Sequence, residues 1–368
     1  MRYYIIAGEA SGDLHGGNLI KAIHEQDNNA DVRCWGGDRM EAAGAVLVKH
    51  YRSLAFMGFV EVIANLRTIL KNIDTCKKDI LAYKPDVLVL IDYPGFNMRI
   101  AEWAKKQGIR IVYYISPQVW AWKEKRVVKL KRDVDKMLVI LPFEVDFYKK
   151  WDYEVTYVGH PLVEVVRHEK EDVPIQVISG KPIIALLPGS RAQEIKVKLP
   201  IMLQMVKHFP AYQFVIAQAS AQPDSLYNDM IGAEPVMLVK DQTYNLLKQA
   251  RAGLITSGTA TLETALFGLP QVVCYKGNAI SFWLAKKLVS VKYISLVNLI
   301  MDKPVVTELI QQDLTETNLK AALDRLLNDE AYQKELKQDY ETLWHELGDK
   351  RASELAAAEI VRVVRKDV

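Results

Sequence analysis

Short apolar runs alternate along the chain with longer segments whose apolar residues recur every three or four positions. The runs have the length of buried strands, and the longer segments have the period of helices that pack on a sheet. This alternation predicts an α/β fold with parallel sheets. The expected strands are Tyr3–Ala7, Asp31–Trp35, Asp86–Ile91, Arg110–Ile115, Lys136–Leu141, Pro182–Leu187, Phe214–Ala217, Pro235–Val239, Gly253–Thr256 and Gln271–Tyr275.

The chain starts the same pattern twice. A strand, a small-residue turn and a helix follow one another from Tyr3, and the same order begins again at Pro182. Because 368 residues exceed the usual size of one core, we expect two Rossmann-like domains facing across a cleft. They would cover residues 1–166 and 167–344, with a C-terminal helix at about 345–368 packing back on the first.

Composition narrows the class of protein. The formal net charge of +3 is too small to indicate a nucleic-acid partner. Three cysteines far apart in the sequence argue against a disulfide framework and indicate a reducing compartment. No apolar run reaches the 18 or so residues of a membrane span, which leaves contact with a membrane surface open.

The segment Ser257–Glu263, with the letters SGTATLE, has the pattern of an anion site. It follows a buried strand and precedes a helix expected from Thr264, so unpaired N–H groups and the helix dipole meet there. Gly258 permits close approach of a phosphate, and Thr259 and Thr261 add hydroxyl donors. Glu263 can accept from ribose hydroxyls. An ordinary capped helix is the alternative.

A second small-residue turn, Pro188–Arg191, follows the strand that opens the second half. Gly189 and Ser190 form the turn, and Arg191 is a fixed cation suited to a phosphate. A surface arginine without a ligand is the alternative.

Asp92 ends an apolar strand and precedes Pro94-Gly95, which we expect to form a turn. Ligands of open α/β sheets bind beyond the carboxyl ends of strands. A partly desolvated carboxylate there has a raised pKa suited to a general base, and Asn97 can orient it. A helix-capping aspartate is the alternative.

Two further loops hold candidate contacts. The turn Gly8–Asp13 supplies Glu9, Ser11 and Asp13, but lacks the spacing of a dinucleotide fingerprint. Trp120 and its neighbour Trp122 follow another strand, where they form either a pocket wall or a small core.

The segment Phe56–Ile73 is amphipathic. Such a helix either packs on a sheet or lies at a membrane interface. The basic segment Lys123–Arg132 can likewise contact anionic lipid. The candidate membrane face consists of Phe59, Val62, Ile63, Leu66, Ile69 and Leu70.

Eight segments in order resemble the lipid-A-disaccharide synthase family over nearly the whole chain. They are GEASGD, FMGFVEV, IDYPGFN, SPQVWAW, GHP, LLPGSR, SGTATLE and YISLVNLI. The family consists of inverting glycosyltransferases of the GT-B type. The resemblance implies transfer of 2,3-diacylglucosamine from UDP to the 6-hydroxyl of 2,3-diacylglucosamine 1-phosphate (lipid X), without metal or cofactor.

The same resemblance assigns residues. Asp92 takes the place of the family's candidate base, Arg191 that of its diphosphate-binding arginine, and Glu263 and Asn298 those of UDP contacts. Some members have a second aspartate where this chain has Gly95, which puts a two-acid mechanism in doubt. The implied location is the cytoplasmic face of the inner membrane of a Gram-negative bacterium, on its anionic surface. The resemblance leaves open whether the chain forms a homodimer.

Two alternatives compete with this interpretation. A UDP-sugar epimerase would share the fold and need no lipid, but leaves the apolar segment near residue 59 unexplained. A peripheral lipid-binding protein without catalysis would not need Asp92. Asp133-x-Asp135 matches a metal-binding pattern, but no third ligand is near in the sequence, so we expect no metal there.

Overall fold

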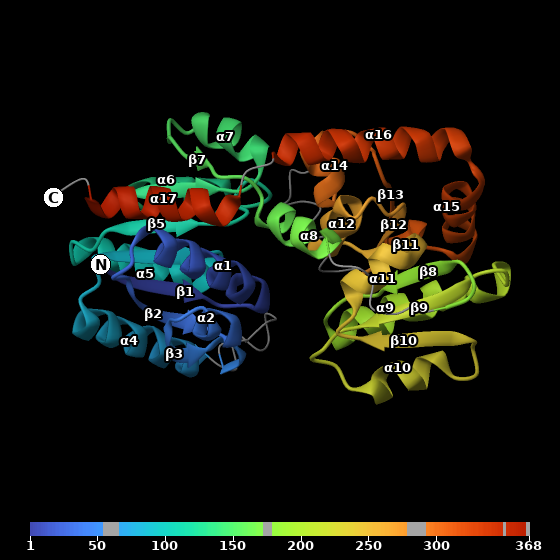
Figure 1. Cartoon of the computed structure of the whole chain (residues 1–368), viewed down its shortest axis with the longest axis horizontal. Helices are drawn as coiled ribbons and strands as arrows, with labels where there is room; N and C mark the ends of the chain where they lie inside the picture. Colours follow the sequence, from blue (N-terminus) through green and yellow to red (C-terminus); the bar gives the residue numbers. More distant parts are fainter. Residues whose placement is uncertain (54–65, 172–178, 278–291, 349–350, 366–368) are drawn as a thin grey trace. The chain divides into compact units, whose positions relative to one another are not determined.

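The chain forms two compact units. The structure is a computed structural model and describes residues 1–53, 66–171, 179–277, 292–348 and 351–365 (Figure 1). One unit contains Met1–Pro161 and Asp349–Val368, and the other contains Leu162–Gly348. The second unit begins earlier than the boundary expected after residue 166, because Leu162 and Val166 are buried in its core.

The first unit is built on a parallel sheet of seven strands among the described residues. Their order is β3-β2-β1-β4-β5-β6-β7, so the direction of strand addition reverses between β1 and β4. The strands are β1 (Arg2–Ala7), β2 (Asp31–Gly36), β3 (Val46–His50), β4 (Val87–Ile91), β5 (Ile111–Tyr114), β6 (Lys136–Val139) and β7 (Thr156–Tyr157).

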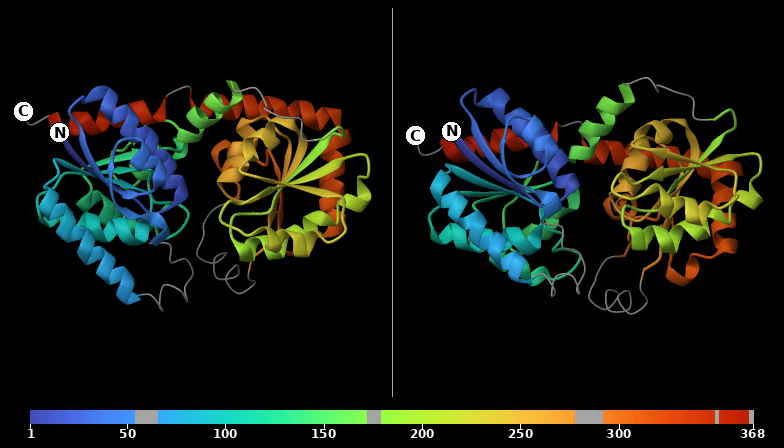
Figure 2. Two further views of the ribbon diagram at one scale, coloured as in Figure 1. Left: turned by 60° about the horizontal axis from the view of Figure 1, so that its bottom comes forward. Right: turned by 90° about the horizontal axis from the view of Figure 1, so that it is seen from below.

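Helices cover both faces of this sheet (Figure 2). Alternate residues of a strand point to opposite faces, so Tyr3 and Ile5 enter one core and Tyr4 and Ile6 the other. This double burial explains the continuous apolar runs in the sequence. The helices are α1 (Ala10–Gln26), α2 (Asp38–Ala42), α4 (Leu66–Tyr83), α5 (Pro94–Lys106), α6 (Val127–Asp133), α7 (Pro142–Lys149) and α17 (Ala352–Arg365).

The C-terminal helix α17 belongs to the core of the first unit, beside α1 (Figure 1). Ile360 and Val364 are buried there, and burying such side chains stabilises by about 1.5–3 kcal/mol each. Arg110 Nη1 donates to the backbone oxygen of Val364 at 2.9 Å, near the negative end of the helix dipole. The last helix therefore completes a domain that the first residues begin.

The second unit repeats the architecture with the strand order β10-β9-β8-β11-β12-β13, again all parallel. The order reverses between β8 and β11. The strands are β8 (Ile183–Leu187), β9 (Gln213–Gln218), β10 (Val236–Lys240), β11 (Ala250–Thr256), β12 (Gln271–Tyr275) and β13 (Thr307–Ile310). The helices are α8 (Pro161–Glu171), α9 (Ala192–Leu203), α10 (Asp224–Ile231), α11 (Thr243–Gln249), α12 (Thr259–Leu266), α14 (Leu296–Met301), α15 (Glu316–Asn328) and α16 (Glu330–Leu347).

All ten expected strands are present within a few residues of their predicted bounds. The helix starts were predicted less well. Helix α1 begins at Ala10 and α12 at Thr259, so both expected small-residue turns are largely first helical turns. Pro94 and Gly95 likewise open α5 rather than forming a separate turn. Strands β3, β7 and β13 were not predicted, because short edge strands with polar residues lack a long apolar run.

Candidate functional site

The point where strand order reverses in the first sheet brings two sequence-predicted acids together. Strands β1 and β4 are neighbours, with Ala7 opposite Ile91. Glu9 therefore follows one strand end, and Asp92 follows the adjacent one. Ligands of open parallel sheets bind at this place because the loops on its two sides diverge.

The backbone of Asp92 is held in an unusual conformation. Asp92 and Tyr93 have φ values of 42° and 50°, in the left-handed region that non-glycine residues seldom adopt. Tyr113 Oη donates to the backbone oxygen of Asp92 at 2.6 Å, and Asn97 Nδ2 donates to it at 2.8 Å. Asn97 thus orients the backbone of Asp92 and not, as we had expected, its carboxylate.

Electrostatics suit Asp92 to accept a proton. Burial, the largest cause, and the negative charge of Glu9 together raise the pKa of its carboxyl to about 6, although the backbone N–H of Tyr93 opposes the rise. A base whose pKa lies near neutral pH is largely deprotonated at that pH and still binds a proton well. The second acid of this site is Glu9, because Gly95 has no carboxyl and faces open space.

The other candidates of the N-terminal loop have different roles. Asp13 is buried, and its carboxylate accepts from the backbone N–H groups of Arg39 and Met40, both at 3.1 Å. It therefore caps α2. Ser11 is exposed on the first turn of α1.

Trp120 is buried and packs edge-on against Phe143, with ring centroids 4.9 Å apart. This packing agrees with the alternative of a small core, and a role of Trp120 in a pocket wall stays a prediction. Trp122 is the exposed ring of this loop, with Lys123 Nζ 4.2 Å and the Arg126 guanidinium 5.4 Å from its centroid.

The predicted membrane face is only partly described. Phe59, Val62 and Ile63, and the side chain of Leu66, lie outside the described residues. In the described helix α4, Ile69 packs against the core while Leu70 is 52% exposed. Asn72 of the same helix is buried.

The second sheet also places two predicted loops at its reversal point. Strands β8 and β11 are neighbours, with Leu187 opposite Ile255. The PGSR turn (Pro188–Arg191) follows the first strand, and SGTATLE (Ser257–Glu263) follows the second. Gly189 and Gly258 have φ values of +126° and +145°, which side chains other than glycine rarely adopt.

Within SGTATLE, the structure separates exposed groups from internal ones. Gly258 and Thr259 are exposed at the N-terminus of α12. The Thr261 hydroxyl is buried and donates to the backbone oxygen of Gly258 at 2.8 Å, so the expectation of a phosphate donor at Thr261 was wrong. Ser257 Oγ donates to the backbone oxygen of Ile294 at 3.1 Å.

Glu263 is half-buried and has a partner that we had not predicted. Its Oε1 accepts from Tyr244 Oη at 2.9 Å, and burial raises the pKa of the carboxyl despite this hydrogen bond. Tyr244 comes from α11 and was missed because an aromatic residue on a helix gives no local sign of binding.

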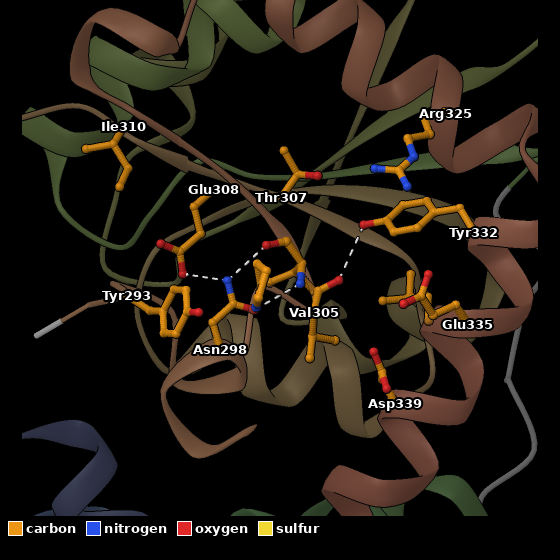
Figure 3. A pocket seen from close by; sticks show the side chains of 13 residues that line it. Tyr293, Asn298, Val305, Thr307, Glu308, Ile310, Arg325, Tyr332, Glu335 and Asp339 are labelled. Atoms are coloured by element: carbon orange, nitrogen blue, oxygen red, sulfur yellow. Dashed lines mark hydrogen bonds between the residues drawn. The ribbon is translucent and has the colours of Figure 1, made fainter. Parts of the chain in front are cut away.

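Asn298 is buried and fully engaged within the second unit (Figure 3). Its Nδ2 donates to the Val306 oxygen and to Glu308 Oε1, and its Oδ1 accepts from the Val306 N–H, all at 2.9 Å. Glu308 in turn accepts from the backbone of Ile294, the residue that Ser257 contacts. Asn298 therefore supports the SGTATLE loop from behind.

A cavity of about 490 Å³ opens beside Asn298 (Figure 3). Among the predicted site residues that the structure describes, only Asn298 lines this cavity. Its lining is otherwise Tyr293, Pro304, Val305, Val306, Thr307, Glu308, Ile310, Arg325, Tyr332, Glu335, Leu336 and Asp339. Among the described residues, no group of three or more His, Cys, Asp or Glu side chains can hold a metal ion.

Asp133 and Asp135 both have structural partners. Asp133 forms an ion pair with Arg132 at 2.6 Å. Asp135 accepts from the Ile111 N–H at 2.9 Å and pairs with Lys105. Asp135 therefore links β5 and α5, whereas Asp133 pairs with its neighbour on α6.

Solved structures show the same fold. UDP-GlcNAc 2-epimerase from Neisseria meningitidis, bound to UDP-GlcNAc, matches with a TM-score of 0.68 and 12% identity over 100% of both chains. The glycosyltransferase of kitacinnamycin also has a TM-score of 0.68, at 15% identity over 99% of both chains. The two Rossmann-like units, with loops at both reversal points, have the GT-B fold, which a UDP-GlcNAc 2-epimerase and a glycosyltransferase share.

Sequence comparison identifies the family. The family model described as lipid-A-disaccharide synthetase matches residues 3–361. Lipid-A-disaccharide synthases of Trichlorobacter lovleyi and Geobacter sulfurreducens are 39% and 36% identical to this chain. These matches cover 90% and 100% of the chain, and 89% and 98% of the two relatives. The chain belongs to the lipid-A-disaccharide synthetase family and is a transferase of lipid A biosynthesis.

Proposed function

We propose that the chain transfers 2,3-diacylglucosamine from UDP to the 6-hydroxyl of 2,3-diacylglucosamine 1-phosphate. The products are the β-1,6-linked disaccharide 1-phosphate and UDP. The observation that carries the proposal is Asp92, a half-buried carboxylate with a pKa of about 6 at the strand end where the sheet order reverses. Family membership supplies the substrates.

The chemistry needs one base and one stabilised leaving group. Asp92 accepts the proton of the acceptor 6-hydroxyl, whose oxygen attacks the anomeric carbon of the donor sugar. The bond from that carbon to the UDP oxygen breaks on the opposite side, so the configuration inverts. Asp92 lies in the first unit, and the groups that stabilise UDP lie in the second.

The nucleotide is bound by the two loops of the second sheet. Arg191 has a side chain that is 60% exposed, so it can reach a diphosphate. Gly189 and Ser190 shape its turn, and the exposed N–H groups at Gly258 and Thr259 add donors at the positive end of α12. Glu263, held by Tyr244, accepts from the ribose hydroxyls.

We further infer that the first unit contacts an anionic membrane surface on the cytoplasmic side, where acylated substrates reside. Leu70 and Trp122 are 52% and 41% exposed, on a helix and a loop that belong to the same unit. Lys123 and Arg126 flank the Trp122 ring and can meet lipid phosphates. Among the described helices, none is long and apolar enough to span a bilayer.

The test is UDP release from UDP-2,3-diacylglucosamine, with and without the acceptor. We expect acceptor-dependent release by the wild type and its loss in Asp92→Asn, while UDP binding persists. Asp74→Asn is the matched control, because Asp74 is an exposed carboxylate paired with Lys78 on α4. Full activity of Asp92→Asn would remove Asp92 as the base. Turnover of UDP-N-acetylglucosamine without lipid would point to an epimerase instead.

A further inference from the structure

A lysine of the second unit is buried directly behind the nucleotide loops. Lys198 on α9 is 3% exposed, and its Nζ donates to Thr256 Oγ1. Thr256 is the last residue of β11, immediately before the SGTATLE loop. Lysine is rarely buried, because taking its charge out of water is costly unless a partner compensates for it.

The partner is Glu194, which lies between two cations. Its Oε1 is 3.5 Å from Arg191 Nη1, and its Oε2 is 3.9 Å from Lys198 Nζ. The three side chains are one turn apart on α9 or at its N-cap, so they share a face of the helix. The carboxylate also touches the PGSR turn, since a Cβ atom on Gly189 would lie 2.5 Å from Oε2.

We propose that Lys198 is a positioning residue that neutralises Glu194, so that Arg191 can leave this carboxylate and bind the diphosphate of UDP. The inference rests on the proposed function, because the ligand is the UDP of that reaction. The residue has no direct contact with substrate in this proposal, and it acts through Glu194 and Thr256.

The charge balance gives the physical reason. When Arg191 turns to a diphosphate, Glu194 would lose that cation, and its negative charge would repel the ligand. Burial lowers the pKa of Lys198, and the negative charge of Glu194 opposes that shift. As an ammonium group, Lys198 places a positive charge beside Glu194 and removes much of this penalty. Its neighbours are Arg191 at the N-cap of α9, Glu194 on α9, Thr256 on β11 and Cys274 on β12. Burial raises the pKa of the Cys274 thiol, which therefore stays neutral.

Calorimetric binding of UDP and of uridine tests the proposal, with four variants beside the wild type: Lys198→Met, Glu194→Gln, the double variant and Lys196→Met. We expect Lys198→Met to weaken UDP binding by about tenfold, the scale of one charge-assisted hydrogen bond, and to leave uridine binding unchanged. Adding Glu194→Gln to Lys198→Met should restore most of the lost affinity for UDP. Lys196 is an exposed lysine of the same helix, so Lys196→Met should match the wild type.

Several results would overturn the inference. One is a double variant that binds UDP as weakly as Lys198→Met, and another is an equal loss of uridine affinity, which would indicate a distorted loop. If Lys198→Met does not fold, Glu194→Gln alone decides: it should bind UDP at least as tightly as the wild type, and weaker binding contradicts the proposal. A wild type that does not bind UDP would overturn the proposed function itself.

Discussion

At the scale of single residues, the surroundings of Asp92 give its carboxylate the proton affinity of a candidate base. Asp92 is an ordinary carboxylate by composition. The left-handed backbone at Asp92 and Tyr93, held through the Asp92 carbonyl by Tyr113 and Asn97, places it at a buried strand end. Burial and the charge of Glu9 then disfavour its ionised form. Its proton affinity is therefore a property of the site.

We predict an acid limb in the pH dependence of kcat/KM. The base must be deprotonated, so activity should fall as the pH drops through about 6, by about tenfold per pH unit below it. Glu9→Gln removes a negative charge that raises the pKa of Asp92, so its acid limb should move to lower pH. Steady-state rates between pH 5 and 8 measure both effects. A profile that is flat across this range in the wild type would contradict the assignment.

At the scale of elements, exposure distinguishes two classes of apolar residue in the first unit. Ile73 on α4 is 7% exposed and belongs to the core, whereas Leu70, less than a turn away, is 52% exposed. Trp122 is exposed between two cations in the loop that precedes α6. Exposed apolar groups beside cations are typical of surfaces that bind lipid headgroups.

We predict that Leu70→Ser combined with Trp122→Ala reduces binding to vesicles that contain anionic lipid. The melting temperature should change little, because both side chains are largely exposed. Ile73→Ser is the comparison, and it should lower the melting temperature through loss of core packing. Vesicle sedimentation and thermal unfolding provide the two readouts. If the double variant of Leu70 and Trp122 has a lower melting temperature and still binds vesicles, these two side chains stabilise the fold and do not bind lipid.

At the scale of the whole molecule, the first unit encloses two histidines near its boundary. His15 on α1 and His160 after β7 are buried, and His15 Nδ1 has no hydrogen-bond partner. Burial lowers the pKa of His15 to about 4, and burial together with the nearby His15 lowers that of His160 to about 3. Both are neutral in the folded chain at neutral pH.

We predict that His15 makes the chain sensitive to acid. Its folded pKa lies below the unfolded value of 6.5, so the unfolded chain binds more protons as pH falls from 6.5 to about 4. Stability should drop by about 1.4 kcal/mol per pH unit in that window for this group. Asp92 and Glu144 have raised pKa values and act in the opposite sense, so the difference between wild type and His15→Gln is the quantity to measure.

Calorimetric unfolding at pH 7 and pH 5 measures this difference. The stability lost on acidification should be smaller in His15→Gln than in the wild type. His208→Gln is the control, because His208 lies in the second unit in a partly exposed pair with Glu316. Equal acid losses in wild type and His15→Gln would show that His15 is not buried as a neutral group.

Local pattern was enough to determine the alternation of strands and helices, and it located the candidate loops at strand ends. Apolar runs such as Ile183–Leu187 are buried on both faces of a sheet, so they are visible in the sequence without knowledge of their neighbours. Glycine and arginine after such a run mark a loop at a strand end. The family resemblance then named Asp92, Arg191 and Glu263.

Only the tertiary structure decided which of the candidate polar groups are bonded within the protein. Asp13, Thr261 and Asn298 were sequence candidates, but their polar atoms bond to backbone groups of α2, of the SGTATLE turn and of the segment before β13. Lys198 and Tyr244 had no signal in the sequence, because Thr256 and Glu263, to which they donate hydrogen bonds, are distant along the chain. Hydrogen-bond satisfaction and burial depend on strand register and helix packing, which local sequence does not specify.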